Sequence, residues 1–318
     1  MKRLLFTGGG GSGSEALYRM LEGRYEVHFV DADIEAKPYL IPSNRWHQIP
    51  FANAITFIDK LQSLCREIVV DVLIPSVDEE LLPIALARSG FTCDVLLPPH
   101  AFVKTHLDKL TSNLFLKTHK LSAPETELLP EHKSILYPCI VKPRQGRGSR
   151  DVRIINSESE LQAHVLLSHR QPDDFILQEL LVGQEYTVMM STNRAGALRA
   201  VVPVKVGIKK GITIRAETDF DEAIINECAA IHAANPVAGC YNIQLVRMKN
   251  GEIKPFEINP RVSTTACLAM AAGANFIDIF LADSNKENYN NSSLLSFSNH
   301  VGLRRTWHNE FLIPQYNR

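Results

Sequence analysis

Several features that mark specialised classes of protein are missing from this sequence. Its apolar runs fall far short of a bilayer span, so we expect no membrane partner. The formal net charge is only −1 over 318 residues, so no overall electric field attracts nucleic acid, and we expect no such partner. The opening MKRLLFTGGGG has only three apolar residues between its basic pair and the threonine that precedes the glycines, and we therefore expect no signal peptide.

Cysteine and histidine are present, but not in the spacing of a redox or zinc motif. The six cysteines contain no C-x-x-C pair and the eleven histidines no H-x-x-x-H pair. This pattern fits reduced, mostly buried thiols and a cytoplasmic protein better than a disulfide framework or a zinc site. With 45% hydrophobic and 22% charged residues, the composition is that of an ordinary globular protein, long enough for two domains.

Strands and helices alternate through the first hundred residues, which predicts a parallel sheet. Gly8, Gly10 and Gly13 form a G-x-G-x-x-G run between a strand and a helix, and Asp31 follows about 18 residues later. Ser14 stands where a P-loop requires lysine. Two interpretations remain: an NAD site of an oxidoreductase, or a tight turn in a Rossmann-like domain that binds no dinucleotide, which we favour because a better nucleotide site lies downstream.

An acidic run, Val77-Asp-Glu-Glu, lies where a predicted strand ends and a helix begins. The carboxyl edge of an open α/β sheet is where such sheets bind ligands. Asp78 and Glu79 are therefore candidates to contact an amine substrate. They are equally well explained as favourable charges at a helix N-terminus.

The segment 242–265, NIQLVRMKNGEIKPFEINPRVSTT, reads as a β-hairpin that turns at Asn250-Gly251. A two-residue loop would place Lys249 opposite Glu252, Val246 opposite Pro255 and Gln244 opposite Glu257. Gln244, Glu257 and Asn259 would then share one face at the open end, with Val246, Met248 and Ile253 continuing it. One carboxylate between two amide oxygens suits Mg²⁺ that carries a polyphosphate. An ordinary hairpin with a polar end is the alternative.

A second informative stretch, residues 137–155, is a strand that ends in a lysine and runs into a glycine- and arginine-rich loop. Lys142 would offer a fixed positive charge to phosphates, and Gly146, Gly148 and Ser149 would offer unobstructed backbone N–H groups. The loop is short and basic, as a lid over a triphosphate should be. A simple glycine-turn hairpin is the alternative.

Together these stretches resemble the ATP-grasp superfamily, most closely the ATP-grasp unit of the carbamoyl-phosphate synthase large chain and single-domain carboxylate–amine ligases. The resemblance rests on the Asp-Lys pair that opens a helix within residues 105–126, on Val141-Lys-Pro with its glycine run, and on the E-x-N-P-R run at 257–261. It implies roles for twelve residues. Lys109 and Lys142 would hold phosphates beneath the backbone of Gly146, Gly148 and Ser149; Glu179 and Leu181 would flank adenine; Glu185 would bind ribose; Gln244, Glu257 and Asn259 would bind magnesium; Arg261 would hold the transferring phosphoryl group. Asp151 departs from the pattern, because a glycine often ends this run.

The implied fold is α/β, of the α+β ATP-grasp type. Residues 1–103 would form a Rossmann-like domain, and residues 104–318 an ATP-grasp domain with a nucleotide-covering part at about 122–182 and a metal and substrate part at 183–318. The resemblance implies Mg-ATP, with Mn²⁺ as an alternative metal, and small-molecule substrates. A carboxylate would attack the γ-phosphate and the resulting acyl phosphate would be captured by an amine or a thiol.

Three alternatives stay open. Carbamoyl-phosphate-like phosphorylation of bicarbonate is disfavoured because Thr264 stands where the synthase pattern has an arginine and because only one ATP-grasp unit is present. An NAD-dependent oxidoreductase would use the N-terminal glycines. A binding protein without catalysis would bind ATP and form no ADP. The sequence leaves open the substrate pair and the oligomeric state, a homodimer included.

Overall fold

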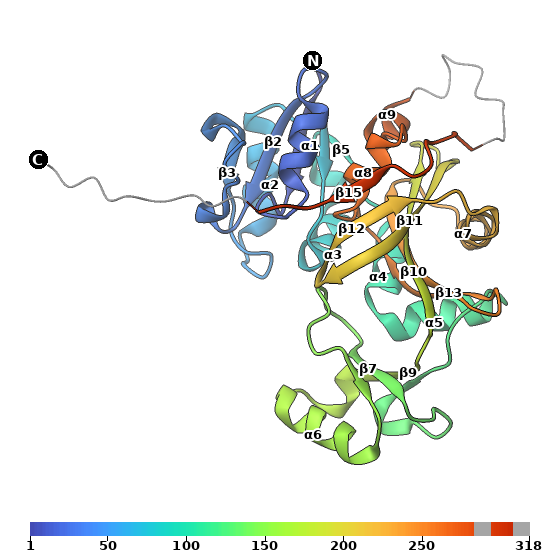
Figure 1. Cartoon of the computed structure of the whole chain (residues 1–318). Helices are drawn as coiled ribbons and strands as arrows, with labels where there is room; N and C mark the ends of the chain where they lie inside the picture. Colours follow the sequence, from blue (N-terminus) through green and yellow to red (C-terminus); the bar gives the residue numbers. More distant parts are fainter. Residues whose placement is uncertain (283–293, 308–318) are drawn as a thin grey trace, which may run out of the picture.

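A computed structural model of the chain describes residues 1–282 and 294–307. Its strands form three sheets, each from a separate stretch of sequence. Figure 1 shows the N-terminal sheet at the top of the view and the small sheet with β7 and β9 at the bottom, and the long strands of the third sheet extend between these levels. Within the described residues, no helix combines the length and the apolar character that crossing a bilayer requires.

The N-terminal sheet is parallel throughout, with strand order β3-β2-β1-β4-β5. Its central strands are continuous apolar runs buried on both faces, as expected of a sheet covered by helices on both sides. One face packs with α2 and α3, and the other joins a core that includes α1, α8 and α9. The elements are β1 Arg3–Thr7, α1 Ser14–Leu21, β2 Glu26–Asp31, β3 Trp46–Gln48, α2 Phe57–Glu67, β4 Val72–Ile74, α3 Asp78–Leu86 and β5 Asp94–Val95.

Two helices, rather than the single one expected near residue 105, connect this sheet to the rest: α4 His100–Leu107 and α5 Lys109–Thr118. Asp108 separates them in an extended conformation and caps α5, with Oδ1 accepting from the N–H groups of Leu110 (2.9 Å) and Thr111 (3.2 Å). Arg144 Nη2 donates to the other carboxylate oxygen of Asp108 at 2.6 Å. The cap therefore fixes the first residue of α5, Lys109, against the loop that follows β7.

The small sheet is antiparallel, in the order β6-β9-β7-β8. Its core is covered on one side by α6. The connection between β7 and β8 is the glycine- and arginine-rich loop, which projects from the sheet toward the rest of the molecule. The elements are β6 Thr126–Leu128, β7 Cys139–Pro143, β8 Arg153–Ile155, α6 Glu158–Ser168 and β9 Phe175–Glu179.

The third sheet is antiparallel and has the order β14-β13-β10-β11-β12-β15. Helices α4, α5 and α7 pack on one face, and α8 and α9 contribute to the core on the other. The elements are β10 Gly183–Thr192, β11 Leu198–Lys210, β12 Ile212–Thr218, α7 Glu222–Ala234, β13 Cys240–Met248, β14 Ile253–Asn259, α8 Ala266–Ala271, α9 Phe276–Leu281 and β15 Gly302–Arg304.

The β13–β14 hairpin forms as expected, but its turn differs from the prediction. Met248 N donates to Glu252 O at 2.8 Å and Gly251 N to Met248 O at 3.0 Å, so the loop has three residues, with Gly251 at φ +91°. This is the turn-plus-bulge alternative in which glycine takes the left-handed position. Val246 consequently pairs with Lys254 rather than Pro255, and Ile253 packs with the core on the face opposite the one predicted.

A β-bulge then restores the predicted register at the open end. The ladder passes from Leu245↔Pro255 to Gln244↔Glu257, which leaves Phe256 as the extra residue. The two shifts cancel, so Gln244 lies opposite Glu257 and Asn242 opposite Asn259. Pro255 is tolerated because β14 is an edge strand of the sheet.

The predicted domain boundaries at 103 and 182 remain predictions, although each sheet lies within one predicted segment. Near the end of the chain, β15 pairs with β12 at the edge of the third sheet.

The Asp108 cap gives a stability prediction. We expect Asp108→Ala to lower the unfolding free energy by about 1–2 kcal/mol, because α5 loses its cap and Arg144 its partner. Asp108→Asn keeps a capping oxygen without the charge and should lose less. Thermal and urea unfolding midpoints measure both variants, and an Asp108→Ala protein as stable as the wild type would show that the cap contributes nothing.

Candidate active site

One cavity of about 1130 Å³ lies where the three sheets meet. Its walls come from the β7–β8 loop, the connection between β9 and β10, the β11–β12 and β13–β14 hairpins, and the carboxyl edge of the N-terminal sheet. All twelve residues implicated by the sequence line it: Lys109, Lys142, Gly146, Gly148, Ser149, Glu179, Leu181, Glu185, Gln244, Glu257, Asn259 and Arg261. They come from positions more than 150 residues apart, as the span from Lys109 to Arg261 shows.

Glu257 is the acidic centre of this cavity, with three lysines around it. Its side chain is 18% exposed, and Lys109 Nζ lies 3.3 Å from Oε1. Burial by itself raises the pKa of Glu257, but the charges of Lys109, Lys142 and Lys209 outweigh burial and hold that pKa below its ordinary value. A carboxylate kept ionised among three cations leaves this part of the cavity with a positive balance, which suits a polyanion.

Lys142 reaches the cavity from β7 and is almost wholly buried. Its Nζ donates to Gln178 Oε1 at 2.9 Å and to the carbonyl of Phe256 at 3.3 Å. Phe256 is the bulged residue of β14, and a bulge leaves a backbone group without its ladder partner. Burial lowers the pKa of Lys142 to about 8; Glu257 opposes this shift, and Lys109 and Lys209 add to it.

The oxygen donors proposed for a metal share the cavity face of the β13–β14 hairpin. Gln244 Oε1 accepts from Lys209 Nζ at 3.2 Å, and Asn259 Nδ2 donates to Asn242 Oδ1 at 3.3 Å. That second bond uses the amide nitrogen of Asn259, so the amide oxygen of the same side chain is not involved in it. One carboxylate and two amide oxygens are a donor set that suits Mg²⁺, and lysine ammonium groups contact two of these side chains in the structure.

The β7–β8 loop has the backbone conformation of a glycine-rich lid. Gly146 and Gly148 have positive φ, and a β-carbon at either position would meet no atom within 4 Å. Ser149 and Asp151 also lie at positive φ, +57° and +56°, which explains why glycine would suit position 151. Asp151 instead anchors the loop through an ion pair of 3.0 Å with Arg170. Lys109 Nζ donates to Gly146 O at 2.9 Å.

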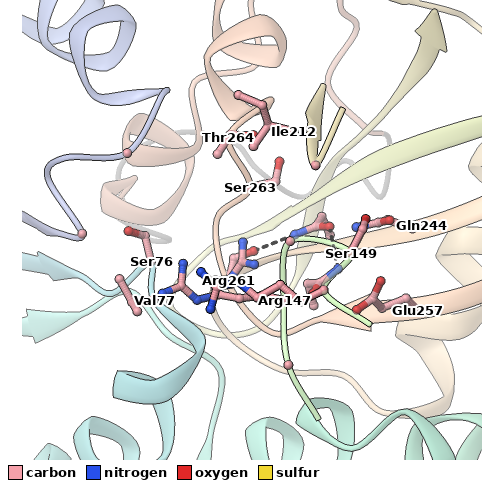
Figure 2. Close-up of a pocket in the computed structure, with 18 of the residues that line it drawn as sticks. Ser76, Val77, Arg147, Ser149, Ile212, Gln244, Glu257, Arg261, Ser263 and Thr264 are labelled. Atoms are coloured by element: carbon pink, nitrogen blue, oxygen red, sulfur yellow. Dashed lines mark hydrogen bonds between the residues drawn. The ribbon is translucent and has the colours of Figure 1, made fainter. Parts of the chain in front are cut away.

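Two arginines connect this region to the N-terminal domain. Arg147 Nε lies 2.9 Å from a carboxylate oxygen of Glu79, and Arg261 forms an ion pair with Asp78. Figure 2 shows both arginine side chains between Ser76–Val77 on one side and Gln244 and Glu257 on the other. Asp78 and Glu79 are therefore engaged with protein cations in this structure, in addition to starting α3.

The end of the cavity assigned to adenine and ribose is formed by the link between β9 and β10. Glu179 and Leu181 line it, with Glu179 bound to Lys254 Nζ and to the N–H of Glu125 (3.0 Å). Glu185 pairs with Lys209. Because Lys209 contacts both Glu185 and Gln244, one side chain bridges the proposed ribose and metal positions.

The N-terminal glycine loop lines the same cavity, at the end near Arg261 and Thr264. Asp31, the acidic residue of the dinucleotide fingerprint, accepts from the N–H of Gly10 at 2.9 Å. A β-carbon on Gly10 would lie 2.6 Å from Ala36 Cβ, so the protein's own residues cover this turn closely. These contacts favour a structural turn over an NAD site.

Sequence reasoning left Lys209 undecided between a substrate-facing position and a solvated charge run, and it assigned no role to Arg147 or Gln178. Lys209 was visible as part of a basic run, and Arg147 as part of the glycine loop, but a charge run gives no direction for its side chains. Gln178 gave no signal at all, because it acts by accepting a hydrogen bond from a lysine on a neighbouring strand.

The chain was compared with known proteins by sequence. The family model described as "ATP-grasp in the biosynthetic pathway with Ter operon" matches residues 171–301. A D-alanine–D-alanine ligase from Geobacter sulfurreducens is 26% identical over 141 residues, which is 41% of this chain and 45% of that protein. The matched region thus spans less than half the length of this curated relative. A D-alanine–D-alanine ligase from Pelobacter propionicus is 35% identical over 22% of this chain and 23% of that protein.

Solved structures resemble a much larger part of the chain. An L-amino acid ligase from Bacillus licheniformis superimposes with a TM-score of 0.67 at 18% identity, covering 88% of this chain and 73% of that one. An N5-carboxyaminoimidazole synthetase from Staphylococcus aureus, complexed with ADP, has a TM-score of 0.66 at 14% identity, covering 85% and 73%. The fold, the family match and the sequence relatives agree with the resemblance found in the motifs. Residues 171–301 therefore match an ATP-grasp family model, and the chain as a whole has the ATP-grasp fold.

Proposed function

We propose that the protein is an ATP-dependent, ADP-forming ligase that activates a carboxylate as an acyl phosphate and joins it to an amine. The single observation that carries this proposal is the partly buried Glu257 surrounded by Lys109, Lys142 and Lys209. Phosphoryl transfer between oxygens needs positioning and neutralisation of charge rather than a protein nucleophile. This cluster supplies fixed positive charge together with one acidic ligand.

Each part of the cavity has a role in this proposal. Lys109 and Lys142 bind the phosphates under the backbone of Gly146, Gly148 and Ser149. The β9–β10 link holds adenine, and Glu185 holds the ribose. Arg261 holds the phosphoryl group during transfer, having left Asp78. The proximity of Lys109 to Gly146 supports a lid that closes on the same phosphates that the lysine binds.

Magnesium would be held by Gln244, Glu257 and Asn259, whose oxygens share one hairpin face. When bound, the metal supplies charge neutralisation for the polyphosphate. The lysine contacts to Glu257 and Gln244 support this assignment, because they show that these donors already attract cations.

The choice of an organic acid and an amine rests on position 264 and on the relatives. Thr264 lines the cavity next to Ser263 and close to Arg261, and a threonine offers one hydroxyl where an arginine would grip a small dianion with two hydrogen bonds. The relatives are named D-alanine–D-alanine ligase and L-amino acid ligase, which supports a reaction between amino-acid-like substrates.

The position of ATP can be tested by photo-cross-linking with an azido-adenine nucleotide. We expect labelling of the peptide that contains residues 176–185, because the β9–β10 link forms the adenine end of the cavity. Labelling of the peptide that contains Gly8–Gly13 would contradict this assignment and favour nucleotide binding by the N-terminal glycines.

Glu257→Gln tests the metal ligand. We expect turnover to fall on the order of 100-fold, because the acidic ligand is lost, while the affinity for ATP falls less. Glu252→Gln, on the exposed turn of the same hairpin, is the matched control and should behave as the wild type. Thermal unfolding shows whether each variant is folded. Near-normal activity of folded Glu257→Gln with Mg²⁺ would remove Glu257 from the metal site.

Measuring ADP release with bicarbonate alone, and then with a library of carboxylic acids and amines, tests the reaction class. We expect little response to bicarbonate and a clear response to an organic acid. Arg261→Ala should abolish that response, since the transferring group loses its bidentate partner, and Arg261→Lys should keep part of it. Strong stimulation by bicarbonate with carbamoyl phosphate as product would overturn the ligase proposal.

A further inference from the structure

Asp31, Asp33, Glu79 and Glu80 line one end of the cavity, and Asp78 begins α3 beside Glu79. Asp31 and Asp33 accept from backbone N–H groups, Asp78 pairs with Arg261, and Glu79 pairs with Arg147. Glu80 lies in the first turn of α3 and forms no ion pair with the described residues.

Glu80 stands apart because it is buried and incompletely paired. It is 7% exposed, and within the described part of the chain its Oε2 has no hydrogen-bond partner. A buried carboxylate without a full set of donors is costly, and so is a buried carboxylic acid whose O–H finds no acceptor. One oxygen of Glu80 is thus left for a partner that enters the cavity from outside the protein.

We propose that Glu80 binds the cationic amino group of the amine substrate, at the end of the cavity beyond Arg261. This inference rests on the ligase proposed above and adds the position of its second substrate. A primary ammonium brings a buried carboxylate both a compensating positive charge and N–H donors, of which it has three. The hydroxyl-bearing residues Thr7 and Ser76 line the same end and offer further hydrogen-bonding groups.

The position of Glu80 agrees with this role. It lies two residues after Asp78, which contacts Arg261, and a β-carbon on Gly13 would lie 3.5 Å from Thr264 O. The acidic edge therefore adjoins Arg261, which is proposed to hold the phosphoryl group. Figure 2 shows Ser76 and Val77, just before α3, beside the two arginines. An ammonium held there would face the activated carboxylate, and it would pass one proton to the Glu80 carboxylate before its nitrogen attacks and phosphate leaves.

Proton linkage gives the site a pH signature. Burial raises the pKa of Glu80 to about 7; a hydrogen bond with Thr7 opposes this shift, Asp31 and Glu79 add to it, and Arg147 lowers it. Below this pH the carboxyl is protonated and cannot attract a cation. We therefore expect the affinity for an amine to rise between about pH 6 and about pH 8, with protons released on binding.

The first experiment needs no turnover. Side-chain carboxyl signals of ¹³C-glutamate-labelled protein are followed by NMR against pH, and Glu80→Gln assigns the Glu80 signal by its disappearance. The probes are L-alaninamide, a cationic primary amine, and L-lactamide, which has a hydroxyl in its place. We expect L-alaninamide to lower the Glu80 titration midpoint by about one unit or more, and L-lactamide to leave it unchanged.

Glu227→Gln is the matched control, because Glu227 also has a buried oxygen without a partner and a pKa raised by burial, but it lies on α7 outside the cavity lining. Its response to L-alaninamide should equal that of the wild type. A Glu80 midpoint that L-alaninamide shifts no more than L-lactamide does would overturn the inference. Thermal unfolding at about pH 8 checks folding: Glu80→Gln should melt higher than the wild type, since it no longer buries an ionised group.

A kinetic arm separates this inference from the proposed function. With an acid and amine pair that releases ADP, Glu80→Gln should raise the KM for the amine by about tenfold or more and change the KM for ATP by less than about twofold. An unchanged amine KM would refute the role of Glu80 while leaving the ligase in place. Binding of L-alaninamide at Glu80 with no ADP from any pair would instead refute the ligase and retain an amine site.

Discussion

The arrangement around Glu257 depends on one electrostatic constraint, which is that three lysines share a poorly solvated space with only two carboxylates, Glu257 and Glu185. Like charges in such a space repel, and burial already lowers the pKa of Lys142 to about 8. Glu257 offsets part of this repulsion, and the carbonyl of the bulged Phe256 and the amide of Gln178 take the N–H groups of Lys142. An anion would relieve the remaining positive charge, so the interactions that maintain the fold here would also favour the binding of a polyphosphate.

The hairpin that carries Glu257 shows how far local sequence signals reach. Asn250-Gly251 predicted the turn, and side-chain alternation predicted that Gln244, Glu257 and Asn259 share a face. The turn has one more residue than expected, so Val246 does not pair with Pro255 as predicted. The bulge adds one residue, Phe256, to β14 and cancels this shift, so the predicted pairing of Gln244 with Glu257 holds. Local propensity identifies a hairpin, but the choice between turn types and the site of a bulge depends on packing of both faces. Ile253 lies on the opposite face for this reason.

The motifs implicated twelve residues, and in the structure all twelve line one cavity, because each motif belongs to an element whose end faces that cavity. It did not predict the contacts between the N-terminal domain and the rest. Asp78 and Arg261 are 183 residues apart, and Glu79 and Arg147 are 68 apart. Within its own segment of sequence, each of these four residues is an ordinary charged side chain. It gains an ion-pair partner only because separate sheets meet in the folded chain. The same holds for Glu80, which in the sequence is the last of three acidic residues at a helix start and in the structure is the one without a cation.

These contacts divide the cavity by charge. At the end near the β9–β10 link, lysines surround Glu257 and also pair with Glu179 and Glu185, whereas carboxylates line the end formed by the N-terminal sheet, with Arg147 and Arg261 beside them. A reaction that joins a phosphorylated acid to an amine is suited by this polarity, because it must hold a polyanion on one side of the reacting carbonyl and, on the other, an amine that binds as a cation and gives up a proton before it attacks. In the structure the two arginines neutralise Glu79 and Asp78. Transfer of Arg261 from Asp78 to an incoming phosphoryl group would free a carboxylate at the acidic end at the same time, so occupation of the basic end would strengthen the attraction of the other end for a cation.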